Sequence, residues 1–140
     1  MQLDKPLTRI VRDKRYPMEE IHALFKEWDE KYGLDMQARR KRRNIEEFDG
    51  VLVKTWSQRY QLFPLHNKCV KCGLQASYYK LEKQAASKLY HFNLYGIKDG
   101  EEVLFTKDHI IPKSKGGKNH LSNYQVMCHI CNEEKGDKLE

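Results

Sequence analysis

The chain has 140 residues, which is about the size of one domain and excludes a large multidomain machine. It carries 26 Lys and Arg against 20 Asp and Glu, so its formal net charge of +6 favours a polyanionic partner. Because no apolar stretch approaches the roughly 20 residues that span a bilayer and the start lacks an apolar secretory signal, we expect an intracellular protein without membrane contact.

The first predicted element is a helix over residues 17–32. Pro17 suits the first turn of a helix, and Gly33 lies just past the predicted end. Apolar side chains recur at helical spacing along this segment, at Ile21, Leu24, Phe25, Trp28 and Tyr32. We expect this apolar stripe to pack on other N-terminal elements.

Two further helices are predicted before residue 65. Asp35 can cap the first of them, which would contain five consecutive basic residues, Arg39, Arg40, Lys41, Arg42 and Arg43. Such a run is typical either of a solvated or disordered segment or of phosphate binding. The second helix would end before Pro64, because apolar residues recur at spacings of four, four and three, at Leu52, Trp56, Tyr60 and Phe63.

A β-hairpin is predicted after the helices. Residues 88–95 alternate, with Tyr90, Phe92 and Leu94 on one side, and Lys98-Asp99-Gly100 follows with the composition of a turn. The second strand, over residues 101–107, would lead directly into Asp108 and His109. These two polar residues would then stand at the end of a rigid strand.

Four cysteines form two pairs with the two-residue gap of a zinc knuckle: Cys69 with Cys72, and Cys128 with Cys131. In a reducing compartment such pairs indicate metal ligands before disulfides. Four thiolates complete the closed tetrahedral coordination of structural Zn²⁺, with no position left for a catalytic water. A mixed site that uses His66 or His129 is conceivable, but four well-spaced cysteines make it unnecessary.

The last third of the chain combines these cysteines with a dense polar motif. It contains Asp108-His109-Ile-Ile-Pro112, then Gly116-Gly117 and Asn123, and finally Cys128-x-x-Cys131-Asn132-x-x-Lys135. In residue types and spacing, residues 105–137 resemble the HNH nucleases, also called ββα-metal or His-Me finger nucleases. The upstream cysteine pair extends the resemblance to about residue 69, and the first 65 residues lie outside it.

The resemblance implies an α+β fold with two parts. Residues 66–140 would form a zinc-stapled ββα-metal nuclease core, and residues 1–65 a mainly helical, basic region that engages DNA. His109 would be the general base, steadied by Asn123, and Asp108 with Asn132 would hold one Mg²⁺ or Mn²⁺. Many family members have histidine where this chain has Asn132, a change that favours Mg²⁺ or Mn²⁺ over Zn²⁺ or Ni²⁺.

Several basic residues are predicted to contact nucleic acid. Beside a nuclease site, phosphate binding becomes the favoured role of residues 39–43. Lys113 and Lys115 flank a glycine pair that makes either a basic loop against the DNA backbone or a simple turn. Lys135 would share a helix face with Asn132 and point toward the phosphate, and a solvent-exposed lysine is the competing interpretation.

The sequence thus predicts a metal-dependent DNA endonuclease of the HNH type that acts on double-stranded DNA. A monomer with one site would nick, whereas cutting both strands would require a dimer or two events. The alternative is a non-catalytic, zinc-stabilised DNA-binding or regulatory protein. RNA or single-stranded DNA as substrate, the recognition sequence, the oligomeric state and the biological role, such as phage DNA processing or interference between mobile elements, stay open.

Overall fold

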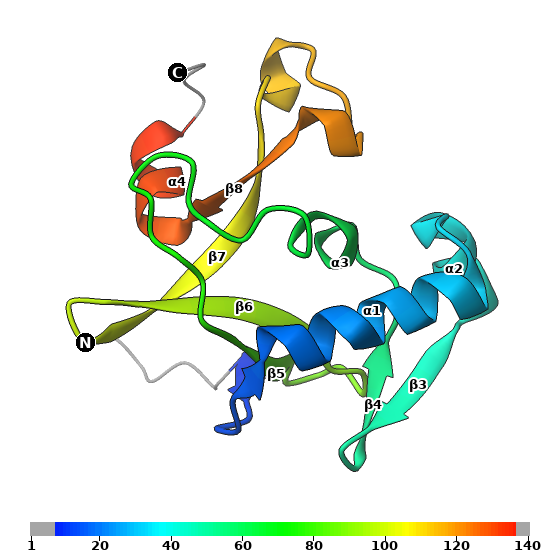
Figure 1. Ribbon diagram of the computed structural model, residues 1–140. Coiled ribbons are helices and arrows are strands. Elements are labelled where there is room, and N and C mark those ends of the chain that lie inside the picture. Colours follow the sequence, from blue (N-terminus) through cyan, green and yellow to red (C-terminus); the bar gives the residue numbers. More distant parts are fainter. Residues whose placement is uncertain (1–7, 137–140) are drawn as a thin grey trace, which may run out of the picture.

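The computed structural model describes residues 8–136, and its α+β fold is built around one antiparallel sheet (Figure 1). The strands are β1 (Arg9–Val11), β2 (Tyr16–Pro17), β3 (Ile45–Phe48), β4 (Val51–Lys54), β5 (Tyr78–Gln84), β6 (His91–Lys98), β7 (Glu101–His109) and β8 (Tyr124–Cys128). The helices are α1 (Met18–Tyr32), α2 (Met36–Arg42), α3 (Arg59–Leu62) and α4 (His129–Lys135), with 3-10 turns η1 (Lys113–Lys115) and η2 (Leu121–Asn123).

The main sheet has six strands, which come from both the N-terminal and the C-terminal parts of the described chain. Its order is β1-β5-β6-β7-β8, and β2 pairs with the other end of β5. All of these pairings are antiparallel. Two strands of the N-terminal region therefore lie in the same sheet as the strands that lead to the predicted site.

Helix α1 forms where the apolar periodicity predicts it, and its stripe faces the core. Ile21, Phe25 and Trp28 are buried, and the ring of Phe25 stacks on Tyr60 of α3 with centroids 4.3 Å apart. The same ring meets Phe92 of β6 edge to face at 5.7 Å. Such aromatic pairs contribute about 0.5–1.5 kcal/mol each beyond area burial. This cluster ties the N-terminal helices to the sheet.

Helix α2 begins as predicted, because the Asp35 carboxylate accepts hydrogen bonds from the backbone N–H groups of Gln37 and Ala38. The position of Arg39 differs from the prediction. Its side chain is fully buried and donates to the carbonyl oxygens of Gly33 and Thr55. A buried guanidinium that is hydrogen-bonded inside the protein cannot reach a phosphate, so the predicted contact of Arg39 with nucleic acid is wrong.

The third predicted helix is wrong over its first half. The start of this segment belongs instead to β4, which pairs with β3 in a two-stranded hairpin. Asp49 and Gly50 form the turn between the two strands with φ of 48° and 83°, the combination of a type I′ turn. Only Arg59–Leu62 is helical. The Asp-Gly pair and the alternation of buried Val53 with exposed Leu52 outweigh the four-residue spacing of the apolar residues.

The predicted hairpin over residues 88–107 is confirmed. β6 and β7 pair across a turn in which Asp99 and Gly100 have φ of 52° and 82°. β7 extends beyond the predicted range to His109, so both Asp108 and His109 are in the strand. Strands β5 and β8, which had not been predicted, flank this hairpin in the sheet.

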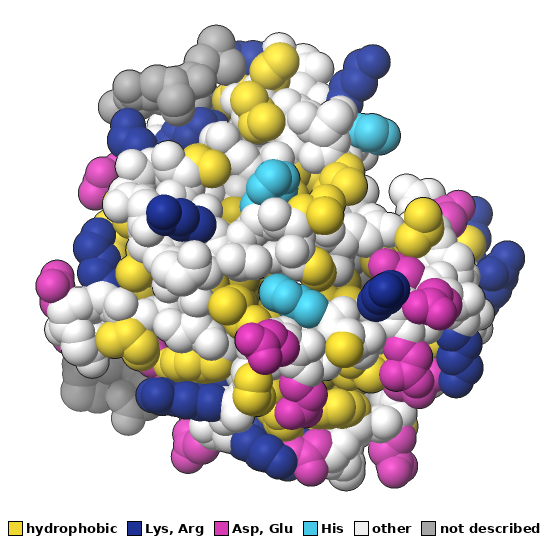
Figure 2. All heavy atoms as spheres, in the orientation of Figure 1, with side chains coloured by type: hydrophobic (Ala, Val, Ile, Leu, Met, Phe, Trp, Pro, Cys, Tyr) yellow, Lys and Arg dark blue, Asp and Glu magenta, His cyan; other side chains and the backbone are white. Residues whose placement is uncertain are grey.

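Charges on the surface are largely intermixed. Figure 2 shows acidic and basic side chains interspersed on the face drawn in Figure 1. Pairs such as Lys31 with Glu46 (2.7 Å) and Lys14 with Asp49 (2.9 Å) neutralise one another. The excess positive charge therefore matters most where cations lack an acidic partner.

Candidate active site and metal centre

The four predicted cysteines come together at one point. Their sulfur atoms all lie within 4.8 Å of one another, and the Sγ atoms of Cys72 and Cys128 are 3.9 Å apart. A tetrahedral Zn²⁺ with bonds of about 2.3 Å requires sulfur atoms roughly 3.8 Å apart, so the cluster fits this ion. Burial raises the pKa of the Cys131 thiol, and a bound cation would stabilise its thiolate form.

Backbone hydrogen bonds position the two cysteine pairs. The N–H of Cys69 donates to Leu74 (2.8 Å), and the N–H of Val70 donates to Val126 of β8 (3.0 Å). The first pair is thereby fastened to the strand that ends in the second pair. His129 instead lies 3.6 Å from Glu133, and His66 is exposed, so neither belongs to the cluster.

His109 ends β7 and faces a cleft. Its partner in the register of the sheet is Tyr124, and the two rings meet edge to face with centroids 5.1 Å apart. The Nε2 atom of His109 lies 2.8 Å from the Oδ1 atom of Asn119. Two contacts therefore hold the imidazole at the surface of the cleft.

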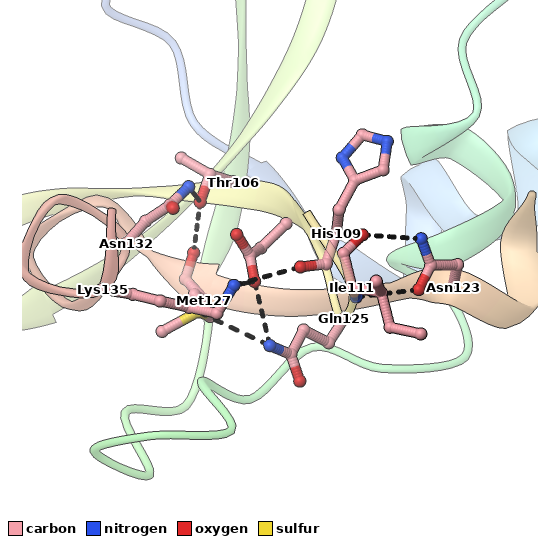
Figure 3. A network of polar contacts seen from close by, with 9 residues as sticks. Thr106, His109, Ile111, Asn123, Gln125, Met127, Asn132 and Lys135 are labelled. Carbon is pink, nitrogen blue, oxygen red and sulfur yellow. Dashed lines mark hydrogen bonds and ion pairs between the residues drawn. The ribbon is translucent and has the colours of Figure 1, made fainter. Parts of the chain in front are cut away.

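Asn123 holds the chain that follows His109. Its backbone carbonyl accepts from Ile110 (2.8 Å), and its side chain both accepts from and donates to the backbone of Ile111 (2.9 and 3.1 Å) (Figure 3). Gly117 lies against the same loop, where an added Cβ would come within 1.6 Å of the Ile111 carbonyl oxygen. Asn123 thus acts on the backbone beside the histidine, and Gly117 is required by close packing.

Asp108 and His109 are neighbours in β7, and successive side chains of a strand point to opposite faces, so Asp108 lies on the other face of the strand from the imidazole. Its Oδ2 atom accepts from Gln125 (2.9 Å) and pairs with the Lys135 ammonium (3.0 Å), which also donates to the His109 carbonyl oxygen (3.1 Å). Lys135 is only 6% exposed. The structure therefore contradicts both a solvent-exposed Lys135 and one that reaches toward a phosphate.

Asn132 projects from α4 onto the same side of β7 as Asp108. Its Nδ2 donates to the Thr106 hydroxyl (2.8 Å), which in turn donates to the Met127 carbonyl oxygen (2.9 Å). Within residues 8–136, no hydrogen bond engages the Oδ1 atom of Asn132 or that of Asp108. Each side chain thus offers one hard oxygen, the ligand type that Mg²⁺ prefers.

A cleft of about 640 Å³ opens in front of His109. One wall comes from the N-terminal region and the other from β7, β8 and the loop between them; its polar lining includes Arg40, Gln58, Lys107, Lys113, Asn119 and Tyr124. The Oε1 atom of Gln58 accepts hydrogen bonds from the Tyr124 hydroxyl (2.6 Å) and the Lys107 ammonium (3.1 Å). Sequence reasoning missed Gln58, Asn119 and Tyr124, since no spacing pattern marks them.

Lys113 and Lys115 lie in the 3-10 turn η1 and are exposed, so they remain candidates for contact with nucleic acid. Arg40, Lys41, Arg42 and Arg43 are exposed as well. No helix within residues 8–136 is long and apolar enough to cross a membrane.

Comparison with known proteins gives one match. Residues 96–140 match a family model described as HNH endonuclease, and this range includes the predicted catalytic residues and the second cysteine pair. No curated protein and no solved structure matches the chain. The family implies a nuclease that acts on nucleic acid. Residues 96–140 are therefore similar to the HNH endonuclease family, and the four cysteines lie close enough together to hold a metal ion such as zinc.

Proposed function

We propose that the protein is a metal-dependent endonuclease that hydrolyses phosphodiester bonds in double-stranded DNA. The observation that supports this most strongly is the position of His109. Its imidazole stands in a cleft with three cationic side chains, Arg40, Lys107 and Lys113, and it lies within the family match. A base beside cations suits attack on a phosphodiester anion.

The contact with Asn119 indicates which ring nitrogen of His109 carries the proton. The Oδ1 atom of Asn119 is a hydrogen-bond acceptor, so the Nε2 atom that faces it carries the proton. Nδ1 then has the free lone pair and takes the proton from the attacking water. Tyr124 limits rotation of the ring, and Asn123 holds the next two residues, so both act by positioning.

Asp108 and Asn132 would hold one Mg²⁺ or Mn²⁺ through their available oxygen atoms. The ion would neutralise the phosphate and stabilise the departing 3′ oxygen. Lys135 and Gln125 bind the other oxygen of Asp108 and thereby fix the direction of the carboxylate. The neutral Asn132 is kept in place by Thr106.

The remaining elements would support this site. β7, β8 and α4 would form the ββα-metal core, and one Zn²⁺ at the four cysteines would join the loop before β5 to α4. The N-terminal region would engage DNA beside the cleft. One site cuts one strand, so a monomer should nick.

Supercoiled plasmid tests the activity. Open-circular product is expected with Mg²⁺, little product without an added divalent ion, and a loss of about 10²–10⁴ in rate for His109→Ala. His66→Ala, at an exposed histidine outside the cleft, is the matched control and should cut like the parent protein. DNA binding with equal cleavage by His109→Ala, or with no cleavage of plasmid or genomic DNA, would support a non-catalytic DNA-binding protein instead.

A further inference from the structure

A second pocket of about 520 Å³ adjoins the cleft of His109. The two hollows share Arg40, Trp56 and Ser57 in their walls, so they lie side by side. The second pocket lies outside the family match, because its lining comes from residues 40–59 and 84–93. It is therefore a feature of this chain beyond its HNH segment.

Four basic side chains line this second pocket: Arg40, Arg43, Lys54 and Arg59. We call it the cationic pocket. No acidic residue lines it, and none of the four forms an ion pair within residues 8–136. Elsewhere on the molecule, lysines such as Lys31 and Lys80 lie within 3 Å of a carboxylate. Four unpaired cations around one hollow repel one another, and a bound anion would relieve that repulsion.

The lowered pKa of Lys54 is consistent with this repulsion. Its side chain is half-buried, and burial together with the nearby charges of Arg59 and Arg40 lowers its pKa. Burial and the charges of Lys54, Arg59 and Arg9 lower the pKa of His91, in the same pocket, to about 4. His91 therefore stays neutral at pH 7, and the pocket holds its positive charge on arginine and lysine alone.

Within residues 8–136, Arg43 contacts an aromatic ring and not a carboxylate. Its guanidinium lies over the ring of Trp56, 5.5 Å from the centroid. A cation held by an aromatic face keeps its N–H groups available, whereas one held by a carboxylate does not. Trp56 is in the wall shared with the cleft, so Arg43 and Arg40 stand where a ligand would pass from one hollow to the other.

We propose that the cationic pocket binds a backbone phosphate of the nucleic-acid strand away from the bond that is cut, and leads that strand past Arg40 to His109. This inference rests on the proposed nuclease function. The ligand is a phosphodiester chain, because four cationic side chains line the pocket and it lies beside the cleft of His109. Discrimination among bases is not part of its role, since phosphate contacts position a strand and carry no sequence information.

Binding by the double variant Lys54→Gln/Arg59→Gln tests the proposal. Both changes are made in His109→Ala protein, so that the labelled DNA duplex stays intact. Its affinity should fall about tenfold or more at moderate salt, and the slope of log K against log salt should decrease by about 2. The control Lys71→Gln/Lys98→Gln removes the same charge outside the pocket and should change both quantities far less.

Stability distinguishes a binding role from a structural one. Removal of a half-buried, unpaired cation relieves repulsion, so Lys54→Gln should unfold at the same or a higher temperature than the parent. The pKa of His91, followed by NMR, should rise when a short oligonucleotide binds, because phosphate offsets the charges of Lys54 and Arg59. Equal binding by the pocket variant and its control would overturn the inference.

Two further arms separate this inference from the function it rests on. If plasmid is never cut but the pocket variant still loses DNA binding, the cationic pocket stands and the nuclease proposal fails. If plasmid is cut equally well by pocket and control variants, the nuclease stands and the pocket assignment fails. Displacement of DNA by inorganic phosphate only at high concentration supports a polynucleotide site, whereas tight phosphate binding that DNA does not compete for would contradict it.

Discussion

The ammonium of Lys135 lies 3.0 Å from the carboxylate of Asp108, and less than a tenth of either side chain is exposed. The pair joins the last turn of α4 to the end of β7. Because Lys135 also donates to the His109 carbonyl oxygen, one lysine holds both residues of the Asp-His pair. It therefore acts as a positioning residue.

Replacement of Lys135 tests this role. Lys135→Met would leave a buried Asp108 with Gln125 as its only described partner, so we expect the free energy of unfolding to fall by about 3 kcal/mol or more. Urea denaturation without added Mg²⁺ measures the change. Glu134→Met, an exposed site on the same helix, is the control. Equal stability of the two variants would mean that Lys135 is free to serve the substrate.

The basic run of α2 should divide into one structural and several binding residues. Arg39→Met removes donors to Gly33, Thr55 and Asp29 in the interior, so a stability loss of about 3 kcal/mol or more is expected. Arg42→Met, at an exposed position, should leave stability within about 0.5 kcal/mol and weaken DNA binding. Thermal unfolding and fluorescence anisotropy give the two readouts. The reverse pattern would restore Arg39 to the binding surface.

One zinc per chain is expected at the cysteine cluster. Cys131→Ser should lose the ion and several kcal/mol of stability, because the free energy of binding a structural metal is also free energy of folding. Elemental analysis and thermal unfolding measure the two effects. Withdrawal of Mg²⁺ alone should abolish cleavage and leave the unfolding temperature nearly unchanged. A large loss of stability on withdrawing Mg²⁺ would contradict the separation into structural and catalytic ions.

His91 should make stability depend on pH. Its pKa in the folded protein is about 4, below the ordinary 6.5, so the unfolded chain takes up the proton first as pH falls. The stabilisation is complete above pH about 6.5 and is lost on acidification toward pH 4, by at most about 3 kcal/mol. Denaturation at several pH values should show a shallower acid loss for His91→Gln than for the exposed control His66→Gln. Parallel curves would refute this contribution.

Gln58 should link the N-terminal region to catalysis. Gln58→Leu leaves the Tyr124 hydroxyl and the Lys107 ammonium without their acceptor, so stability should fall by about 1–3 kcal/mol. Because Tyr124 packs on the imidazole, kcat should fall more than the affinity for DNA. Gln61→Leu, in the same cleft but bonded to Leu34, is the matched control. A defect in affinity alone would limit Gln58 to DNA binding.

Local signals explain which elements the sequence predicted. Helix α1 and the turn at Asp99-Gly100 follow from spacing and backbone chemistry within a few residues. The hairpin of β3 and β4 was missed although Asp49-Gly50 is an equally strong turn signal, because apolar residues at intervals of four suggested a helix. A long-range contact decides this segment, because Val53 forms a bridge with Tyr90, which precedes β6 and lies 37 positions further along the chain.

The sequence by itself determined the family resemblance, the expected set of catalytic side chains and the pairing of cysteines at metal-ligand spacing, since each depends on residue types at short, regular intervals. Only the tertiary structure decided what each basic residue does. Arg39 and Lys135 are buried and paired, Arg39 with Asp29 of the preceding helix and Lys135 with Asp108 of β7. Arg40, Arg43, Lys54 and Arg59 line a hollow with no carboxylate to pair them. Charge is a property of composition, but burial and partners depend on which segments the fold brings together.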